Sequence, residues 1–382
     1  MLSQKIKNLL KKLLFPLAKR IIFESNPEMT GNVGAVYEEL IKRGLNRKYK
    51  LVWRVEDKEK YKDYGIPNVS FIDYAPKGFR EKLKDLWYHW TSKAVIFENR
   101  FEEKKWKNQL TVNLMHGMPI KCNGDYVEHD TLDYIVSSGS GLNEVLSREM
   151  DIPIERFVTL GYPRTDVLNE KNGSLEKLGI SGYKGVVVWM PTYRKHKNAE
   201  SHSHEGRQYP GGVPLLESEA QFKSLNECLC ENGYLLIIKL HPAQDIEGLV
   251  KHAESNILLL LNRDLDEKET SVYELLAESD ALLTDYSSIY YDYLLTDKPI
   301  GLVIDDIEEY RQNRGLAFEY KDYIKGDYIY NLDELKTFVE NVAVQKDPAE
   351  AERRWAKEKW CDFTDFKATE RVADFILDKL NA

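Results

Sequence analysis

Short runs of apolar residues alternate with longer amphipathic stretches along most of this 382-residue chain. Each run is long enough for one strand, and each stretch between runs has room for a helix that crosses back over a sheet. This alternation is typical of βαβ units, in which helices cover both faces of a parallel sheet. Because the chain is too long for one ordinary core, the pattern predicts two such domains.

The expected fold class is α/β, with two doubly wound, Rossmann-like domains that face one another across a cleft. The expected strands are Lys50–Val55, Ala94–Phe97, Leu110–Met115, Tyr134–Ser137, Phe157–Leu160, Val186–Met190, Leu235–Lys239, Ile257–Leu261, Ala281–Thr284 and Ile300–Ile304. Residues 333–343 and 350–380 are expected to be helical. The expected domains are 24–168 and 185–350, joined by a polar linker at 169–184 and followed by C-terminal helices at 351–382.

Residues 1–23 differ in composition from the rest of the chain, with six Lys or Arg and no Asp or Glu. On a helix, the apolar residues between Leu2 and Leu14 fall on one face, with lysines beyond its edges. Pro16 should end this segment, and Ile21–Phe23 would extend its apolar surface. We therefore expect a basic amphipathic helix that lies on an anionic membrane surface. The alternative is a first helix packed on the protein's own core.

Composition excludes several other classes of protein. A net charge of −9 disfavours nucleic-acid binding, because neutralising phosphates requires a basic face. The four cysteines, at 122, 228, 230 and 361, lack the paired spacing of a zinc site, and we expect them to be reduced. We expect no bound cofactor and no metal ligands, although the sequence leaves Mg²⁺ open.

Polar residues follow the carboxyl ends of several expected strands, which is where open α/β sheets bind ligands. The segments are His116-Gly117-Met118-Pro119-Ile120-Lys121, Pro191-Thr192-Tyr193-Arg194, Lys239-Leu240-His241-Pro242 and Asp285-Tyr286-Ser287-Ser288. Because the carboxyl ends of parallel strands share an edge, these segments are expected to converge on one site.

Several of these residues suit a phosphate-bearing ligand. Arg194 can bind two phosphate oxygens at once, whereas Lys239 supplies a point charge. Ser287 and Ser288 lie where a helix should begin, so they can hold phosphate, with simple N-capping as the alternative. Arg164 is a further candidate, and its alternative is a surface turn paired with Asp166.

Two histidines are candidates for acid–base chemistry. His116 precedes Gly117 and Pro119, which form a tight loop able to hold the imidazole at the edge of a cleft. A neutral imidazole there can take a proton from an attacking hydroxyl, which is worth about 10²–10⁴ in rate. His241 can instead bind a donor phosphate or protonate the leaving group. The sequence leaves open which histidine is the base.

Taken in order, these motifs resemble the CDP-glycerol glycerophosphotransferases of teichoic-acid and related capsule synthesis. The matching stretches are HGMPIK at 116–121, GYPRTDVL at 161–168, MPTYR at 190–194, KLHP at 239–242 and LLTDYSSIYYDYLLTDKPI at 282–300. Residues 25–44 and 314–318 look like the family's flanking segments. The resemblance implies a glycosyltransferase-B architecture, with an N-terminal acceptor domain and a C-terminal domain that binds CDP-glycerol.

The resemblance also implies roles for individual residues. His116 and His241 would be catalytic, and Lys121 and Arg314 are secondary candidates. The donor-binding set would be His116, Gly117, Met118, Pro119, Ile120, Arg164, Pro191, Thr192, Arg194, Lys239, Leu240, His241, Ser287, Ser288 and Asp292. One departure is Lys325-Gly326-Asp327, where the family often has Pro-Gly-Pro.

The implied reaction moves sn-glycerol 3-phosphate from CDP-glycerol to a lipid-linked saccharide acceptor at the cytoplasmic face of the membrane, releasing CMP. The compact chain looks more like the priming enzymes of the family than its long polymerases. CDP-ribitol or a sugar nucleotide is an alternative donor on the same plan. A non-enzymatic module that binds a nucleotide or a lipid surface is a further alternative, although two histidine motifs favour catalysis. The oligomeric state is left open.

Overall fold

The computed structural model describes residues 16–99, 108–118, 120–122, 132–192, 207, 209, 212–240 and 254–381. The chain divides into two compact units. The first unit contains Met1–Met118, Tyr126–Asp166 and Asp365–Ala382, and the second contains Pro119–Asp125 and Val167–Thr364.

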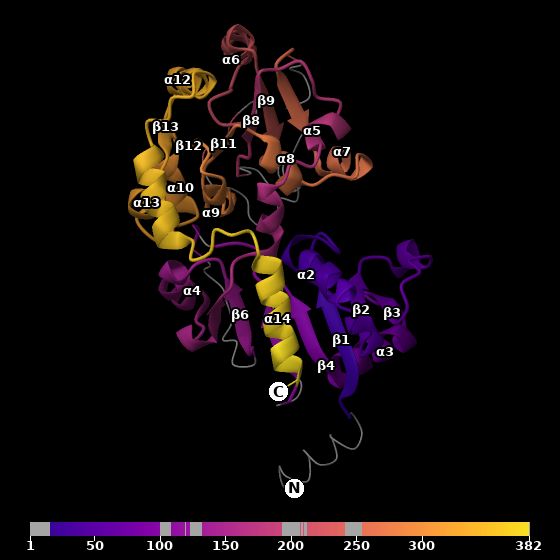
Figure 1. The fold of residues 1–382 in the computed structure, drawn as a ribbon. Helices are drawn as coiled ribbons and strands as arrows, with labels where there is room; N and C mark the ends of the chain where they lie inside the picture. The colour runs from indigo at the N-terminus through magenta and orange to yellow at the C-terminus, as the bar shows by residue number, and fades with distance from the viewer. Residues whose placement is uncertain are drawn as a thin grey trace. The chain divides into compact units, whose positions relative to one another are not determined.

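The first unit is built on a seven-stranded sheet in which every strand pairing is parallel (Figure 1). Its strands are β1 (Ala18–Glu24), β2 (Lys50–Val55), β3 (Val69–Asp73), β4 (Ser92–Phe97), β5 (Leu110–Asn113), β6 (Tyr134–Ser137) and β7 (Phe157–Thr159), in the order β3-β2-β1-β4-β5-β6-β7. Its α-helices are α2 (Gly31–Lys42), α3 (Phe79–Thr91), α4 (Asn143–Met150) and α14 (Ala368–Asn381). Short 3₁₀ turns lie at Leu45–Arg47, Lys58–Tyr61, Ser140–Leu142, Ile154–Arg156 and Pro163–Asn169. The last helix of the chain, α14, packs against α2, and Arg43, which directly follows α2, forms an ion pair with Asp374.

The central strand β1 corrects one expectation. Ile21–Phe23 do not extend the surface of a leader helix; they are fully buried in β1 and pair with β2 and β4. A parallel strand covered on both faces is apolar throughout, so its periodicity does not separate it from a short apolar helix. Residues 1–15, which carry the rest of the expected leader, lie outside the described residues.

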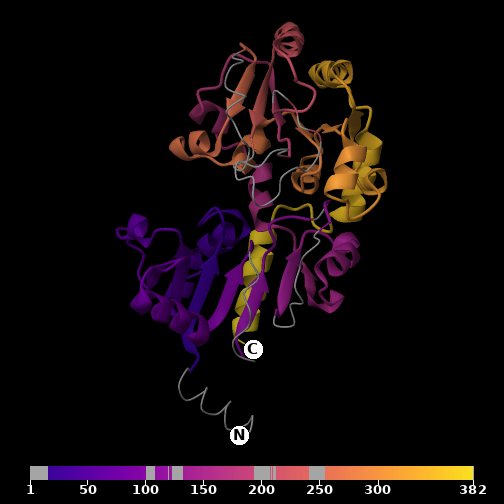
Figure 2. The same cartoon turned by 180° about the vertical axis from the view of Figure 1, so that it is seen from behind.

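The second unit is built on a six-stranded parallel sheet. Its strands are β8 (Gly185–Trp189), β9 (Tyr234–Lys239), β10 (Ile257–Leu260), β11 (Ala281–Thr284), β12 (Ile300–Val303) and β13 (Asp327–Ile329), in the order β10-β9-β8-β11-β12-β13. Its helices are α5 (Ser174–Lys177), α6 (Glu219–Asn232), α7 (Asn262–Glu267), α8 (Val272–Glu278), α9 (Ile289–Tyr293), α10 (Ile307–Asn313), α11 (Tyr320–Tyr323), α12 (Leu332–Ala343) and α13 (Glu350–Trp360), and a 3₁₀ turn lies at Leu294–Thr296. Figures 1 and 2 show α6 and α12 side by side, and their apolar faces close one core of the unit over the sheet.

Both sheets have the strand order of a doubly wound fold, so the α/β prediction is confirmed for each unit. The direction of strand order reverses between β1 and β4 in the first unit and between β8 and β11 in the second. Such a reversal opens a crevice at the carboxyl ends of the two strands, where doubly wound proteins bind ligands. Three strands, β1, β3 and β13, were not expected. No helix in the described part of the chain is both long and apolar enough to span a bilayer.

The borders of the units differ from the expected domain boundaries. The chain passes into the second unit after Asp166, and the expected linker 169–184 packs within that unit. Its helix α5 begins where the side chain of Glu278 accepts backbone N–H groups from Asn172 to Leu175. The expected helical stretch 350–380 is two helices, α13 and α14, which belong to different units.

Candidate active site

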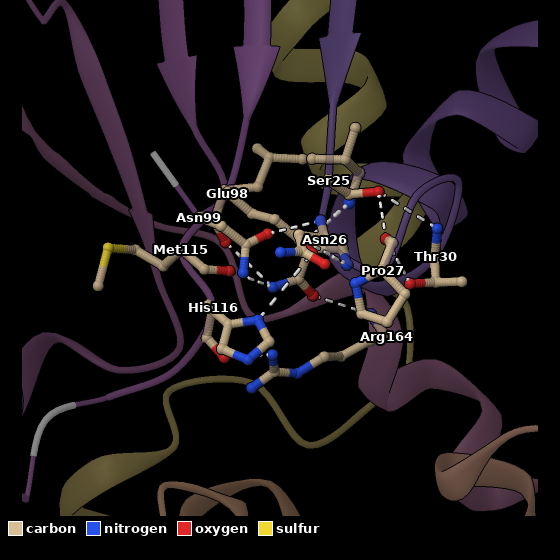
Figure 3. Close-up of polar contacts among 12 residues, drawn as sticks. Ser25, Asn26, Pro27, Thr30, Glu98, Asn99, Met115, His116 and Arg164 are labelled. Atoms are coloured by element: carbon tan, nitrogen blue, oxygen red, sulfur yellow. Dashed lines mark hydrogen bonds and ion pairs between the residues drawn. The ribbon is translucent and has the colours of Figure 1, made fainter. Parts of the chain in front are cut away.

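A buried carboxyl group, Glu98, lies at the strand-order reversal of the first sheet. Glu98 directly follows β4, and its Oε2 accepts backbone N–H groups from Asn32 at 2.9 Å and Val33 at 3.3 Å (Figure 3). These are among the first residues of α2, which begins shortly after β1. Gly31 makes the approach possible: it has a φ of +67°, and a Cβ there would lie 2.6 Å from Glu98 Oε1.

Asn32 ties this helix start to the chain that leads to His116. Its fully buried side chain donates from Nδ2 to the carbonyls of Leu114 at 3.0 Å and Met115 at 2.7 Å. Its Oδ1 accepts the backbone N–H of Arg164 at 3.1 Å. Met115 has a φ of +56°, an uncommon conformation for a side-chain-bearing residue. The backbone immediately before His116 is therefore held from several sides.

His116 presents its imidazole beside Glu98. The side chain is 63% exposed, and Nδ1 lies 4.0 Å from Glu98 Oε1 (Figure 3). The carbonyl of His116 accepts a hydrogen bond from the guanidinium of Arg164. The two candidates His116 and Arg164 therefore lie together at one edge of the sheet.

The structure contradicts the alternative in which Arg164 is a surface turn residue. Arg164 is 8% exposed. Asp166 instead accepts the backbone N–H groups of Ala368 and Thr369 at the start of α14.

Burial raises the pKa of Glu98 to about 7. The positive charge of Arg164 and the hydrogen bonds from Val33 and Asn32 oppose this rise. The group therefore changes charge close to neutral pH, next to an imidazole whose usual pKa is about 6.5. Perturbed carboxyl groups beside an exposed histidine are typical of sites that move protons.

Glu98 and Asn32 were missing from the sequence candidates. Glu98 directly follows the expected strand Ala94–Phe97, so the rule about strand ends would have selected it. Nothing local distinguishes it from an ordinary surface glutamate, because its partners come from α2 and from the loop after β5. The strand order was the missing information.

The next residues of the His116 loop are buried. Met118 is 2% exposed, and Tyr162 directs its hydroxyl to the Met118 sulfur at 3.1 Å. Gly117, between His116 and Met118 in the chain, is half-buried, and Ile120 is 2% exposed. Pro119 lies outside the described residues.

The end of this loop joins the second unit and pairs with the segment at 314–317. Ala317 donates its N–H to the carbonyl of Ile120 at 2.9 Å, and Lys121 forms an antiparallel bridge with Leu316. The guanidinium of Arg314 donates to the carbonyl of Cys122. The secondary candidates Lys121 and Arg314 thus lie on two chain segments that hydrogen-bond to one another.

The strand-order reversal of the second sheet also carries a buried carboxyl group, Asp285, which directly follows β11. Thr192, in the loop after β8, donates its N–H to both oxygens at 3.0 Å and its hydroxyl to Oδ1 at 2.6 Å. Tyr286 adds its own N–H at 2.6 Å. Pro191 and Thr192 are therefore fixed against the end of β11.

Ser287 and Ser288 are half-buried, so solvent reaches both, as a phosphate site requires. The hydroxyl of Ser288 makes no capping hydrogen bond to α9, so its side chain is not the simple N-cap considered above. Asp292, expected as a ligand contact, is 2% exposed and accepts the hydroxyl of Tyr273 at 2.6 Å.

Lys239, at the end of β9, is 4% exposed. Its Nζ donates to the carbonyl of Leu240 at 3.1 Å and to the side chain of Asn262. Burial lowers the pKa of Lys239 to about 8, against the charges of Asp264 and Asp266. Leu240 is buried as well. Arg194 and His241 lie outside the described residues.

Two sheets of doubly wound order, each with a buried carboxyl group at its strand-order reversal, define a two-unit Rossmann-like α/β protein. The fold is similar to a solved structure of the wall teichoic acid polymerase TagF, with a TM-score of 0.72 and 20% identity over 98% of this chain and 96% of that one. It is also similar to a putative UDP-N-acetylglucosamine 2-epimerase from Listeria monocytogenes, with a TM-score of 0.55 and 12% identity over 95% and 97% of the two chains.

The family model of CDP-glycerol:poly(glycerophosphate) glycerophosphotransferases matches residues 8–378. The chain belongs to this family and is an enzyme of teichoic-acid synthesis, a CDP-glycerol glycerophosphotransferase. The resemblance stated from the sequence motifs is thereby confirmed.

Curated relatives agree with this assignment. The chain is 26% identical to a teichoic acid poly(glycerol phosphate) polymerase of Bacillus spizizenii, over 83% of this chain and 82% of the relative. It is 22% identical to a teichoic acid glycerol-phosphate transferase of Staphylococcus aureus, over 97% and 99%. It spans a smaller part, 60%, of a glycerol-phosphate primase of Bacillus spizizenii, to which it is 27% identical over 66% of its own length.

Proposed function

We propose that the protein transfers sn-glycerol 3-phosphate from CDP-glycerol to a hydroxyl of a lipid-linked teichoic-acid or capsule precursor, with His116 as the general base. The observation that carries this proposal is the exposed imidazole of His116 at the strand-order reversal of the first sheet, with the buried carboxyl group of Glu98 beside it. The acceptor oxygen forms a bond to the phosphorus that bears glycerol, while the bond from that phosphorus to CMP breaks. The hydroxyl proton moves to Nε2 of His116, because Nδ1 is the nitrogen that faces Glu98.

We assign acceptor binding to the first unit and donor binding to the second, in a glycosyltransferase-B arrangement. The half-buried residues Ser287 and Ser288, close in sequence to the Asp285–Thr192 contact, support a phosphate site in the second unit. A pKa of about 8 leaves Lys239 mostly protonated at pH 7, so its buried charge can stabilise phosphate even though its Nζ contacts its own unit. Pro191, Leu240 and Asp292, with Arg194, His241 and Pro119, complete the proposed set.

The test is CMP release from CDP-glycerol by the purified protein in the presence of a lipid-linked disaccharide. His116→Ala should lose turnover by about 10²–10⁴-fold and keep its affinity for the donor. Absence of CMP release with every lipid-linked acceptor tried would contradict the transferase proposal. Thermal shift with CDP-glycerol and CDP-ribitol separates the two donors, since the true donor stabilises the folded state more.

We further propose that the enzyme works on an anionic membrane surface, and α3 supports this. Its exposed apolar residues share one face of the helix and are Phe79 at 76%, Leu83 at 47%, Leu86 at 49% and Trp87 at 42%. Exposed Arg80, Lys82 and Lys84 flank that face.

The acidic residues of α3 lie on its other side and are paired within the unit. Glu81 binds Lys58 at 3.0 Å, and Asp85 lies 3.5 Å from Arg54. An apolar face bordered by exposed cations fits the boundary between lipid headgroups and acyl chains, where a lipid-linked acceptor is also anchored. The basic residues of the N-terminal segment before β1 remain a second expected membrane contact.

Sedimentation with phosphatidylglycerol-containing vesicles tests the membrane proposal. Leu83→Glu together with Trp87→Glu should reduce binding strongly, because charge on the apolar face opposes insertion. The control is Val344→Glu, which changes a 70% exposed apolar residue in the second unit and should bind as the unaltered protein does. Equal binding by the α3 variant would contradict a role for α3, and replacing Lys11 and Lys12 by Glu tests the leader separately.

A further inference from the structure

We propose that Glu98 is a positioning residue for His116: its carboxylate accepts the Nδ1–H of the imidazole and stabilises the imidazolium that forms during transfer. This inference rests on the proposed role of His116 as the general base.

The carboxylate of Glu98 is fixed in direction before any substrate binds. Oε2 is held by the N–H groups of Asn32 and Val33, and the side chain is 1% exposed. The backbone of Gly31 closes over the group, so that even a methyl group there would collide with both carboxylate oxygens. Oε1 is the oxygen nearer to His116 (Figure 3). Glu98 thus provides a rigid acceptor.

The side chain of His116 is far more exposed than that of Glu98. Its backbone is held through Met115 and Arg164, while its imidazole is largely exposed. The proposed hydrogen bond requires the 4.0 Å between Nδ1 and Oε1 to shorten to about 2.8 Å, the length of a normal charge-assisted hydrogen bond. In that position Nε2 points away from the carboxylate, toward the side from which an acceptor hydroxyl can approach.

Electrostatics supply a reason for a carboxylate at this position. The guanidinium of Arg164 binds the carbonyl of His116, so an imidazolium would form close to an existing positive charge. The charge of Arg164 also acts on Glu98. With Glu98 ionised, one negative charge lies close to the imidazole and also acts on Arg164, which lowers the cost of protonating His116.

In the proposed step, one proton moves from the acceptor hydroxyl to His116. Glu98 selects the tautomer with hydrogen on Nδ1, which leaves a lone pair on Nε2. The acceptor hydroxyl gives its proton to Nε2 as its oxygen bonds to phosphorus, and CMP leaves with the electron pair of the broken bond. Glu98 takes no proton in this step.

The test is Glu98→Gln, which keeps the size of the side chain. The amide oxygen must face the N–H groups of Asn32 and Val33, so the amide nitrogen turns toward Nδ1 and favours the wrong tautomer. We expect kcat to fall by about 10²-fold or more, with KM for CDP-glycerol within about twofold. The acid limb of kcat/KM should move to lower pH, since His116 loses a negative neighbour.

Two further variants show whether the effect of Glu98→Gln comes from the lost charge beside His116. Glu98→Asp keeps the charge and should recover part of kcat, with its pH limb nearer that of the unaltered enzyme. Glu278→Gln is the matched control: this carboxylate also accepts backbone N–H groups at a helix start, but at α5 in the second unit. It should leave kcat unchanged. Should Glu98→Gln fold poorly, the pKa of His116 measured by NMR in Glu98→Ala and in the unaltered protein provides the same comparison, because Glu98→Ala also removes the negative charge; an unchanged pKa would contradict the inference.

Other outcomes would overturn the inference. A folded Glu98→Gln enzyme with unchanged kcat and pH profile would do so. So would equal losses in the Gln and Asp variants with an unmoved pH limb, which would mean a purely structural role. In a His116→Ala background, Glu98→Gln should cost nothing more; a second full loss there would reject the positioning role and leave the base assignment standing. Full turnover by His116→Ala alone would reject both.

Discussion

The two sheets place a carboxyl group at the same topological position. Comparing these groups distinguishes a carboxylate that holds the fold together from one that is proposed to take part in the reaction. Glu98 follows β4 and Asp285 follows β11, which are equivalent strands in sheets of the same order. Each side chain accepts N–H groups from the segment after the neighbouring central strand: Asn32 and Val33 in one unit, and Thr192 in the other. Both therefore join the two strands on either side of the reversal.

They differ in what the second oxygen does. Both oxygens of Asp285 accept from Thr192, and Oδ1 also accepts from Tyr286. Glu98 uses Oε2 for the helix start, while Oε1 faces the exposed imidazole of His116. A longer side chain and the room left by Gly31 make this possible. At this position, Asp285 ties the loop after β8 to the end of β11, whereas Glu98 is a proposed part of the reaction.

The largest effect on stability is expected at Asp285. Asp285→Ala leaves the N–H and hydroxyl of Thr192 and the N–H of Tyr286 without this acceptor in a fully buried site. At about 1–3 kcal/mol for each unsatisfied donor, we expect a loss of roughly 4 kcal/mol in the free energy of unfolding. Urea denaturation measures it. A loss no larger than that of Glu98→Ala would break the comparison.

The pH dependence of stability should differ between Glu98 and Glu278 in sign. Burial raises the pKa of Glu98 from 4.5 to about 7, so between these values the folded state binds more protons than the unfolded state. Stability from this group therefore falls as pH rises from 4.5 to 7, by on the order of 3 kcal/mol. Burial would also raise the pKa of Glu278, but the N–H groups of residues 172–175 lower it overall. The contribution of Glu278 to stability is instead lost as the pH falls below the pKa of this group in the unfolded state.

The measurement is the free energy of unfolding at pH 5 and pH 7.5 for the unaltered protein, Glu98→Gln and Glu278→Gln. Glu98→Gln should reduce the loss of stability between these values. If all three proteins show the same pH dependence, Glu98 is not the strained carboxyl group described here.

Ten of the thirteen described strands and the α/β class could be predicted from the sequence, because an apolar run of strand length between amphipathic stretches is a local signal. Strand order is not local: β1 lies between β2 and β4 because of contacts across long stretches of chain. For that reason Ile21–Phe23 were assigned to a leader, and Glu98 was overlooked. The candidates His116, Thr192 and Ser288 could be selected because they lie within four residues of the ends of β5, β8 and β11.

Burial was the second property that the sequence did not provide. Arg164 and Lys239 are residue types that commonly bind phosphate at exposed sites. In the structure both are more than nine-tenths buried and donate hydrogen bonds within their own units. Asp292 is one helical turn beyond the serines, but it accepts a hydrogen bond from Tyr273 of α8. Such contacts depend on which helix packs beside which, and no motif encodes them.

Gly31→Ala tests the space that distinguishes Glu98 from Asp285. The added Cβ would lie 2.6 Å from Oε1, and the positive φ of Gly31 adds backbone strain of about 1–2 kcal/mol. We expect a loss of stability of about 2 kcal/mol together with lower kcat, because the carboxylate must move. Gly179→Ala is the control, with a φ of +72° and nothing within 4 Å of the added Cβ. It should show the backbone strain and keep its kcat; equal kcat in both variants would argue against a fixed carboxylate.

The smallest expected effect comes from Thr192→Val, which removes the hydroxyl donated to Asp285 at 2.6 Å and keeps the shape and the N–H. The backbone hydrogen bonds at 3.0 Å remain, so we expect a loss of only about 1 kcal/mol in the free energy of unfolding. Thermal denaturation and CDP-glycerol affinity, measured together, separate two readings of this loop. If the contact between Thr192 and Asp285 is only structural, the free energy of unfolding falls and the affinity for CDP-glycerol changes little, because the loop stays tied to β11 through its backbone. A large loss of affinity at nearly unchanged stability would instead place the hydroxyl of Thr192 on the donor and make the two carboxyl sites more alike than their contacts suggest.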